Sequence, residues 1–308
     1  MGGVSGVTTA LGPILGGFLV ENVSWRAAFL VNVPLAVAVL LIAWRHVPES
    51  RDPNARKLDI PGVVLATTGL GGALYFLPLL LIQVHGYSAT AAGSSFLPFV
   101  IITFLMSRWA GGLITRFGAR PPLVIGPLIA AAGFVLFAIP GTGGSYWTTF
   151  FPAIVVLGFG MALVIVPLTT TALNSVSGRH SGLASGVNNA VARTAGLLAI
   201  PVLGIFVFHI FSGAFDARAQ SLDLSPQVQK QLESEKEDLG GAESPSGVSG
   251  EKAAQIERAI DESFLAAFRL AMLIAAGLAV ASAVAAAVII EGKERAAPAE
   301  RVGQTAPA

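Results

Sequence analysis

The sequence has few charged residues and no cysteine. Charged side chains make up 12% of the 308 residues, about half of the roughly 25% that soluble domains carry. The absence of cysteine excludes disulfides, thiolate metal sites and cysteine nucleophiles. The net charge of +1 gives no support for a nucleic-acid partner. Because 54% of the residues are apolar and the mean hydropathy is +0.72, an ordinary soluble globular fold is excluded as well.

Long uncharged apolar runs dominate the chain instead. Runs of about 20 residues can cross the hydrocarbon core of a bilayer as helices, and 35 glycines and 18 prolines suit close packing of such helices. The sequence therefore predicts an all-α, polytopic transmembrane helix bundle in a lipid bilayer. The eight predicted spans are 2–20, 27–44, 60–84, 94–113, 122–140, 149–172, 184–210 and 265–290.

The spans divide the chain into four regions. They are a membrane bundle with spans one to seven (1–211), an acidic extracytoplasmic loop (212–264), the last span (265–290) and a disordered cytoplasmic tail (291–308).

The acidic loop holds eleven Asp and Glu against five Lys and Arg. Within it, Ile256, Ile260 and Phe264 share one helix face at a spacing of four. This stripe either caps the outer end of the bundle or belongs to a solvated helix that leads into the last span.

Basic residues are distributed unevenly between the two sides of the predicted bundle. Short loops that carry Lys and Arg stay in the cytoplasm, whereas long loops cross the membrane largely regardless of charge. The short loops on one side contain only Arg26. We therefore expect a multi-pass protein of the cell (inner) membrane with both termini in the cytoplasm. The basic residues of the other side are Arg45, Arg51, Arg56, Lys57, Arg116, Arg120, Arg179, Lys293, Arg295 and Arg301.

Acidic residues are missing from the middle of every predicted span. Proton-coupled membrane transport usually relies on a carboxylate in that position. Signatures of phosphate-binding loops, zinc proteases and serine hydrolases are missing too. No two histidines have the spacing of metal ligands. The sequence thus predicts no enzyme, no cofactor and no metal site.

The first predicted span carries a helix-packing motif formed by Gly12, Pro13, Gly16 and Gly17. Gly12 and Gly16 are four residues apart, so together they clear one helix face for a close neighbour, while Pro13 frees a carbonyl and bends the helix. The motif and the Ser24–Phe29 segment after it resemble the fifth-helix signature of antiporters in the major facilitator superfamily.

A second motif lies where a span meets the cytoplasm. Gly111, Arg116, Gly118 and Arg120 resemble a degenerate copy of the cytoplasmic loop motif of that superfamily. The glycines allow a tight turn, and the arginines pair with helix ends or with acidic groups. Thr115 stands where the motif has Asp, so the alternative is a plain cytoplasmic anchor of positive charge.

Further segments resemble the fourteen-helix drug/proton antiporter branch of the superfamily, the EmrB/QacA type. The resemblance implies that this chain is a C-terminal part which lacks the first four helices. It also implies that two more helices are absent, because the span from Ile60 opens like the seventh helix and ends like the ninth, with a join near Gly69–Tyr75. The segments are Asp59–Gly62, Phe76–Leu79, Gly86–Ser88, Ala92–Gly93 and Ser181–Gly186.

Asn189 and Arg193 are the candidate substrate-binding residues. They lie four residues apart on one face of the seventh span, and a charge inside the hydrocarbon costs several kcal/mol unless it finds partners. Arg193 either binds a substrate anion, or organises backbone carbonyls, or is purely structural and extends its side chain to the interface. Arg108 and Arg269 are also expected to extend to an interface.

The resemblance implies multidrug efflux of amphipathic small molecules driven by proton antiport. The alternative is a truncated, non-transporting membrane protein, or a half-transporter that needs a partner polypeptide to supply the missing helices.

Overall fold

The computed structural model describes residues 59–174, 181–222, 224–235, 248 and 250–290, together with scattered positions between 16 and 45. The predicted spans 2–20 and 27–44 thus lie largely outside the described residues. The described elements are α4 (Ile60–Gln83), α5 (Ala89–Ser94), α6 (Leu97–Phe117), α7 (Arg120–Phe137), α8 (Tyr146–Thr149), α9 (Phe151–Asn174), α10 (Ser181–Ala219), η2 (Gln220–Leu222), α11 (Pro226–Glu235) and α12 (Glu251–Ile289).

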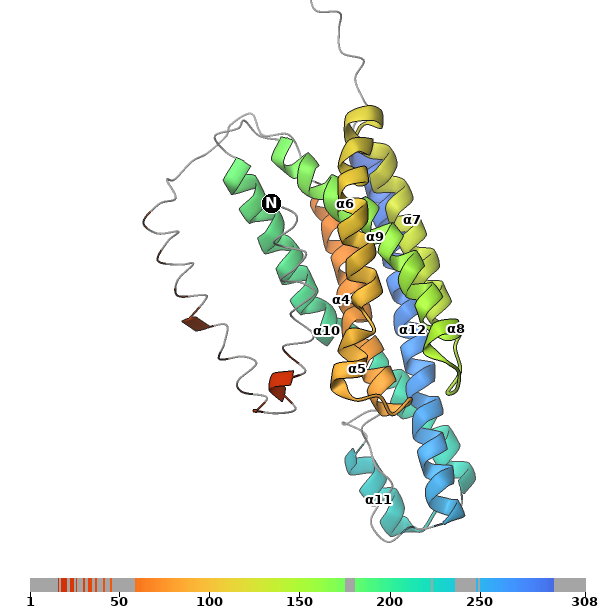
Figure 1. The fold of residues 1–308 in the computed structure, drawn as a ribbon. Helices are drawn as coiled ribbons and strands as arrows, with labels where there is room; N and C mark the ends of the chain where they lie inside the picture. Colours follow the sequence, from red (N-terminus) through yellow and green to blue (C-terminus); the bar gives the residue numbers. More distant parts are fainter. Residues whose placement is uncertain are drawn as a thin grey trace, which may run out of the picture.

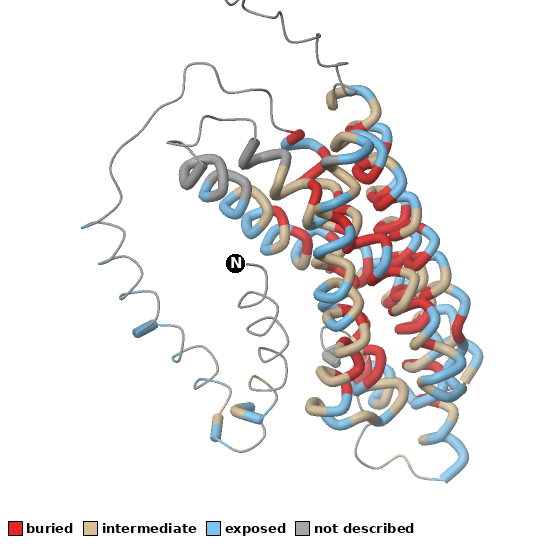
Figure 2. Tube along the Cα trace, turned by 45° about the horizontal axis from the view of Figure 1, so that its top comes forward, coloured by how far each residue is buried: buried red, intermediate tan, exposed pale blue. Residues whose placement is uncertain are grey.

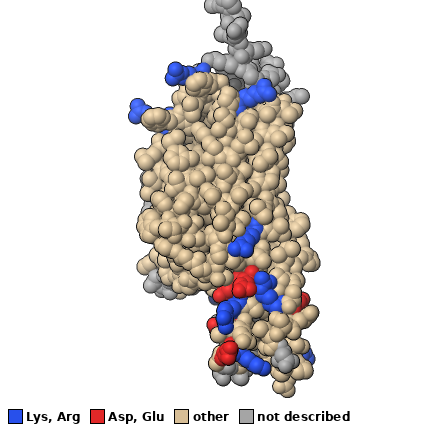
Figure 3. Space-filling view, turned by 90° about the vertical axis from the view of Figure 1, so that its right-hand side faces the viewer, with Lys and Arg blue, Asp and Glu red and all other residues tan. Residues whose placement is uncertain are grey.

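Every element of the described ranges is helical, as the sequence predicts. Among the described residues, six helices are long and apolar enough to cross a membrane. They correspond to the last six of the eight predicted spans. On the face drawn in Figure 3, the middle of the bundle is almost free of charged side chains, and Asp and Glu gather at one end. The partition of charge is that of a polytopic membrane protein.

The six long helices, drawn in Figure 1, fall in chain order into two sets of three, and the helices of each set contact the other set more than one another. The first set is α4, α6 and α7, and the second is α9, α10 and α12. The first helix of each set packs against the third helix of the other set, so that α4 contacts α12 and α9 contacts α7. The second helix of each set contacts the first helix of the other set, so that α6 contacts α9 and α10 contacts α4. Because successive spans alternate in direction, α4 and α9 run oppositely, and the two sets are inverted repeats.

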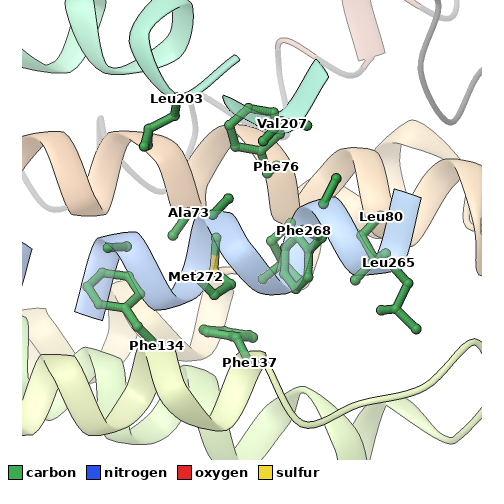
Figure 4. Close-up of a cluster of buried hydrophobic side chains, with 14 of the residues drawn as sticks. Ala73, Phe76, Leu80, Phe134, Phe137, Leu203, Val207, Leu265, Phe268 and Met272 are labelled. Carbon is green, nitrogen blue, oxygen red and sulfur yellow. The ribbon is translucent and has the colours of Figure 1, made fainter. Parts of the chain in front are cut away.

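The apolar core lies along α12, which contacts α4, α7 and α10. Phe268 and Met272 of α12 are fully buried, with Phe76 of α4 and Phe134 and Phe137 of α7 around them (Figure 4). Figure 2 shows that buried positions concentrate in the interior of the bundle, whereas exposed positions follow the outer faces. Large apolar side chains such as Leu105 and Leu197 remain 63% and 73% exposed there, as expected for surfaces covered by lipid or by further helices.

Glycines bring α7 and α9 close together. A Cβ atom added to Gly133 of α7 would lie 2.8 Å from the backbone nitrogen of Leu157. A Cβ on Gly126 would lie 3.0 Å from the carbonyl oxygen of Gly160. At such separations only glycine fits, so glycine serves helix packing here, as the composition predicts.

The helix α4 passes without interruption through the predicted join Gly69–Tyr75. Gly69 faces α12, where an added Cβ would lie 3.2 Å from the carbonyl oxygen of Ala275. Gly71 faces α10, where the corresponding distance to the carbonyl oxygen of Gly196 is 3.3 Å. The segment is therefore wedged between two helices and is a normal part of the packed bundle.

Both α10 and α12 extend beyond the predicted span ends. Each has 39 residues and is about 58 Å long at about 1.5 Å per residue, nearly twice the hydrocarbon thickness of about 30 Å. Neither helix is broken at the predicted limits 210 and 265, and α10 continues through Gly213. The surplus turns of α10 and α12, with η2 and α11, form a structure at one end of the bundle that we call the cap (211–222, 224–235 and 251–264).

The cap has an apolar interior of its own. Ile256 and Phe264 are 0% exposed and Ile260 is 2% exposed. They belong to the same apolar cluster as Phe215 of α10 and Leu232 of α11. The stripe at a spacing of four therefore packs against the end of the bundle, and of the two interpretations the structure favours capping over a solvated helix.

Candidate functional site

The two candidate substrate-binding residues lie on α10, on the face that turns away from the bundle. The side of α10 that packs inwards is a stripe of buried residues at a spacing of four: Ala195, Ala199, Leu203, Val207 and Phe211. Asn189 and Arg193 are exposed instead. The half of α10 that carries them also diverges from α4 in Figure 1.

The point where α10 meets α4 lies just beyond Arg193. A Cβ added to Gly71 would lie 3.3 Å from the Cβ atom of Ala199 and 3.3 Å from the carbonyl oxygen of Gly196. Thr67 is the nearest neighbour of Gly196, with 3.6 Å between its Cγ2 atom and an added Cβ. The N-terminal part of α10 is therefore fixed at one end by a glycine crossing. Asn189 and Arg193 project from the segment that this crossing holds in place.

The cytoplasmic loop motif forms the turn between α6 and α7. Gly118 ends α6 with φ of 85°, and its N–H group donates to the carbonyl oxygen of Ile114. Arg120 begins α7, and its Nη2 atom donates to the carbonyl oxygen of Ala287, 2.5 Å away, in the last turn of α12. Arg116 lies over the ring of Phe117. Thus Gly118 forms the turn between α6 and α7, and Arg120 binds the end of α12.

Alanine substitutions at the two glycines of this motif are expected to have opposite effects. Gly118→Ala forces an alanine into a left-handed conformation and is expected to lower the free energy of unfolding by about 1 kcal/mol. In Gly111→Ala no described atom lies within 4 Å of the new Cβ. The helix-forming tendency of alanine should therefore raise the free energy of unfolding by about 0.5 kcal/mol. Thermal unfolding in detergent measures both variants, and a shift of the same sign would contradict this account of the turn.

The helix-packing motif of the first span is mostly outside the described residues. Gly12, Pro13 and Gly17 are among the residues that are not described. Gly16 is helical and half-buried, and no described atom lies within 4 Å of a Cβ added to it. Close packing of this motif against another helix therefore stays a prediction.

Arg269 of α12 extends to the connection between α7 and α8. Its side chain is half-buried, and its Nη2 atom donates to the carbonyl oxygen of Pro140, 2.8 Å away, in the α7–α8 connection. Its Nε atom is buried without a hydrogen-bond partner. The guanidinium therefore ties α12 to a loop, because a backbone carbonyl lies within its reach. Arg108, in contrast, is exposed on the outer face of α6.

Asp59 caps the start of α4. Its Oδ1 atom accepts a hydrogen bond from the backbone nitrogen of Gly62 at 2.9 Å, and the side chain is buried. Burial raises the pKa of Asp59 above its ordinary value, and the hydrogen bond from Gly62 opposes this rise. The hydroxyl of Ser282 donates to the carbonyl oxygen of Gly62 and joins the start of α4 to α12. The role of the Asp59–Gly62 motif is thus structural, as an N-cap.

The described residues contain no cluster of three or more His, Cys, Asp or Glu that could hold a metal ion. Hydroxyl groups on the described spans bond within their own helices. Thr169 and Thr170, for example, donate to carbonyl oxygens one turn back in α9.

The family model described as Major Facilitator Superfamily matches residues 1–201 of the chain. This match covers more than half of the 308 residues, and the chain belongs to the Major Facilitator Superfamily.

Curated relatives are named for export and resistance. The chain is 27% identical to the Tetracenomycin C resistance and export protein of Streptomyces glaucescens, over 92% of this chain and 66% of the relative. It is 25% identical to the Multidrug resistance protein Stp of Mycobacterium tuberculosis, over 65% of this chain and 50% of that protein. The chain therefore spans between half and two-thirds of these relatives.

The alignment with the tetracenomycin protein contains positions that this chain lacks. It extends over 363 residues, which exceeds the 308 residues of the chain. Part of the relative, inside the aligned region, therefore has no counterpart here.

Among solved structures, the chain resembles a bacterial homologue of the human lysosomal transporter Spinster in an inward-facing, unoccupied conformation. The TM-score is 0.54 at 17% identity, over 92% of this chain and 65% of the other. At this identity the likeness concerns the fold alone.

Proposed function

We propose that this chain is part of an exporter that moves amphipathic small molecules out of the cytoplasm. The observation that carries the proposal is the packing of six spans as two inverted repeats of three helices, the arrangement found within each half of a major facilitator transporter. The names of the relatives, which include tetracenomycin export and multidrug resistance, support the direction of transport and the substrate class.

The transport residues in this proposal are Asn189 and Arg193. Their exposure on a helix that diverges from the bundle makes them accessible to a ligand at membrane depth. A guanidinium group binds carboxylates and other anions, so Arg193 suits the anionic end of an amphipath. The apolar neighbours on α10, such as Leu197 and Leu198, offer contacts with little hydrogen-bond demand and therefore favour broad specificity.

Proton antiport is the coupling that we propose, by resemblance to the EmrB/QacA branch. The described bundle supplies one half of the alternating-access machine, and the other half lies outside these 308 residues. The loss of two helices at the Gly69–Tyr75 join is part of this proposal by the same resemblance, and the unmatched part of the tetracenomycin alignment shows only that some positions of that relative have no counterpart here. Losing two spans together preserves the alternation of direction through the bundle.

A second candidate is a non-transporting membrane protein. The observation that favours it is the position of the carboxylates: within the described ranges, Asp and Glu lie only at helix ends and in the cap. A proton antiporter needs a titratable group at membrane depth. If the missing half supplies that group, the chain is a half-transporter; otherwise it does not transport.

Dye binding tests the proposed substrate site. The Arg193→Gln variant in lipid nanodiscs is expected to bind the anionic dye fluorescein about five times more weakly than the unmodified chain, because the charge partner is lost. Binding of the cationic relative rhodamine 6G should not weaken. Fluorescence polarisation measures both affinities.

The matched control for this experiment is Arg258→Gln, which removes an exposed arginine in the cap. If neither fluorescein nor rhodamine 6G bound saturably to the unmodified chain, the exporter proposal would be overturned. Equal fluorescein affinities for the unmodified chain and the Arg193→Gln variant would remove Arg193 from the site.

Orientation can be tested by labelling, because the chain contains no natural cysteine. Ser50→Cys lies in the basic segment 45–59, and Ser225→Cys lies at an exposed position of the cap. We expect an impermeant maleimide to label Ser225→Cys in intact cells and Ser50→Cys only after permeabilisation, since basic loops stay inside. Labelling of both variants in intact cells would contradict the proposal that both termini are cytoplasmic.

A further inference from the structure

The outer face of α12 is an apolar stripe that begins at an arginine. From Arg269 onwards, exposed positions follow one another at spacings of three or four residues, so they share one face of the helix. This face belongs to the part of α12 that is apolar enough to cross a membrane. The stripe therefore offers a path along which a lipid chain can lie. Its members are Leu273, Gly277, Val280, Val284 and Val288.

Arg269 lies close to the boundary between lipid headgroups and hydrocarbon. It is the only charged residue between Leu265 and Ile289. This segment is about 38 Å long at about 1.5 Å per residue, nearly the thickness of roughly 40–45 Å that a bilayer has with its headgroups. Arg269 is about 6 Å inside the segment, and each headgroup layer is roughly 5–8 Å thick. The long side chain of Arg269 therefore reaches the level of the lipid phosphates.

The connection between α7 and α8 holds the guanidinium at this level. Arg269 donates to the carbonyl oxygen of Pro140, and the chain is exposed directly after it, from 141 to 145. In α8, Trp147 is exposed, and its ring centroid lies 5.1 Å from that of Phe151. Tryptophan is enriched at the level of the headgroups. The bond to Pro140 occupies one of the five N–H groups of a guanidinium, which can hold a phosphate through two parallel hydrogen bonds.

We propose that Arg269 and the stripe bind one anionic phospholipid in the leaflet on the cap side. The phosphate pairs with the guanidinium, and an acyl chain follows Leu273, Gly277 and Val280 towards the middle of the bilayer. An arginine at the edge of the hydrocarbon is stabilised by an opposite charge. A headgroup with a net negative charge is favoured over a choline headgroup, because the latter carries an ammonium group that neutralises its own phosphate. This site is independent of the proposed substrate site on α10.

A fluorescent label at Leu273 tests which lipid lies on the stripe. The chain contains no cysteine, so Leu273→Cys takes a single bimane label. The labelled full chain is placed in nanodiscs with equal amounts of phosphatidylglycerol and phosphatidylcholine, of which only one carries brominated, quenching chains. We expect brominated phosphatidylglycerol to quench the label about three times more strongly than brominated phosphatidylcholine, as attraction between an arginine and anionic lipid implies.

The matched control label is at Ile101, an exposed position near the start of α6. That end of α6 lies at the same end of the bundle as α8 (Figure 1). Both brominated lipids should quench the Ile101→Cys label equally. Equal quenching by the two lipids at Leu273, or the same preference at both positions, would overturn the proposal.

The charge of Arg269 provides the second arm of the experiment. We expect Arg269→Gln to abolish the preference at Leu273, whereas Arg269→Lys keeps part of it and the exposed cap control Arg258→Gln leaves it unchanged. A preference that survives Arg269→Gln would contradict binding at this site. Excess inorganic phosphate should not displace the lipid, and displacement would show recognition of a free anion instead. The lipid comparison needs no change at Arg269, so it decides the proposal even if that variant does not fold.

Discussion

The Gly160→Leu substitution is expected to separate α7 from α9 and to destabilise the bundle by about 3 kcal/mol, at the upper end of overpacking effects. A Cβ atom at this position would lie 2.8 Å from the Cα atom of Ala130 and 2.9 Å from the carbonyl oxygen of Gly126. Both are backbone atoms, which cannot move aside as the tip of a flexible side chain can. The thermal unfolding midpoint in detergent and the yield of monodisperse protein measure the effect.

The matched control is Gly277→Leu in α12. Gly277 is exposed, and no described atom lies within 4 Å of an added Cβ, so this leucine finds open space on the outer face of the bundle. We expect its unfolding midpoint to stay close to that of the unmodified chain. Equal midpoints for Gly160→Leu and Gly277→Leu would show that the α7–α9 crossing does not depend on glycine.

Much of this fold follows from the sequence, because a helix in lipid must be long, apolar and uncharged. The runs that begin near Ile60, Arg120 and Phe151 become α4, α7 and α9 within a few residues of the predicted limits. The high glycine content also predicts close helix packing, and Gly133 and Gly160 provide it at the α7–α9 crossing.

The lengths of α10 and α12 could not be predicted in the same way. Their outer turns carry charged residues such as Asp216 and Glu262, which resemble a soluble loop by composition. What keeps these turns helical is mutual packing within the cap, where Phe215 and Phe264 join one cluster, together with the ion pair between Arg218 and Glu262. Such contacts join residues more than 40 positions apart, and a local pattern does not contain them.

The candidate site is predictable only in part, for a physical reason. The spacing of Asn189 and Arg193 fixes that they share a helix face, and the structure places both on the exposed side of α10. The groups that lie opposite Asn189 and Arg193 belong to other helices, and the local spacing of residues carries no information about those helices. Arg269 illustrates the same limit, because its partner is a backbone carbonyl at Pro140 that no side-chain pattern reveals.

The unmodified chain is expected to show no proton-driven export when it is the only protein in the membrane. Proton exchange needs a group whose pKa can move between the two sides, and a buried carboxylate is the usual solution. The described spans offer arginines such as Arg108 and Arg193 instead, and a guanidinium stays protonated. In addition, one half of a major facilitator fold leaves the midplane site open on one flank.

The most direct test of the half-transporter account is dye movement in proteoliposomes that contain only this 308-residue chain. Vesicles loaded with rhodamine 6G receive a pH gradient, and release of the dye is followed by fluorescence, with protein-free vesicles as the control. The account predicts release at the rate of protein-free vesicles, while the same preparation still binds dye saturably. Saturable release that stops when a protonophore is added would contradict it and would establish this chain as a complete exporter.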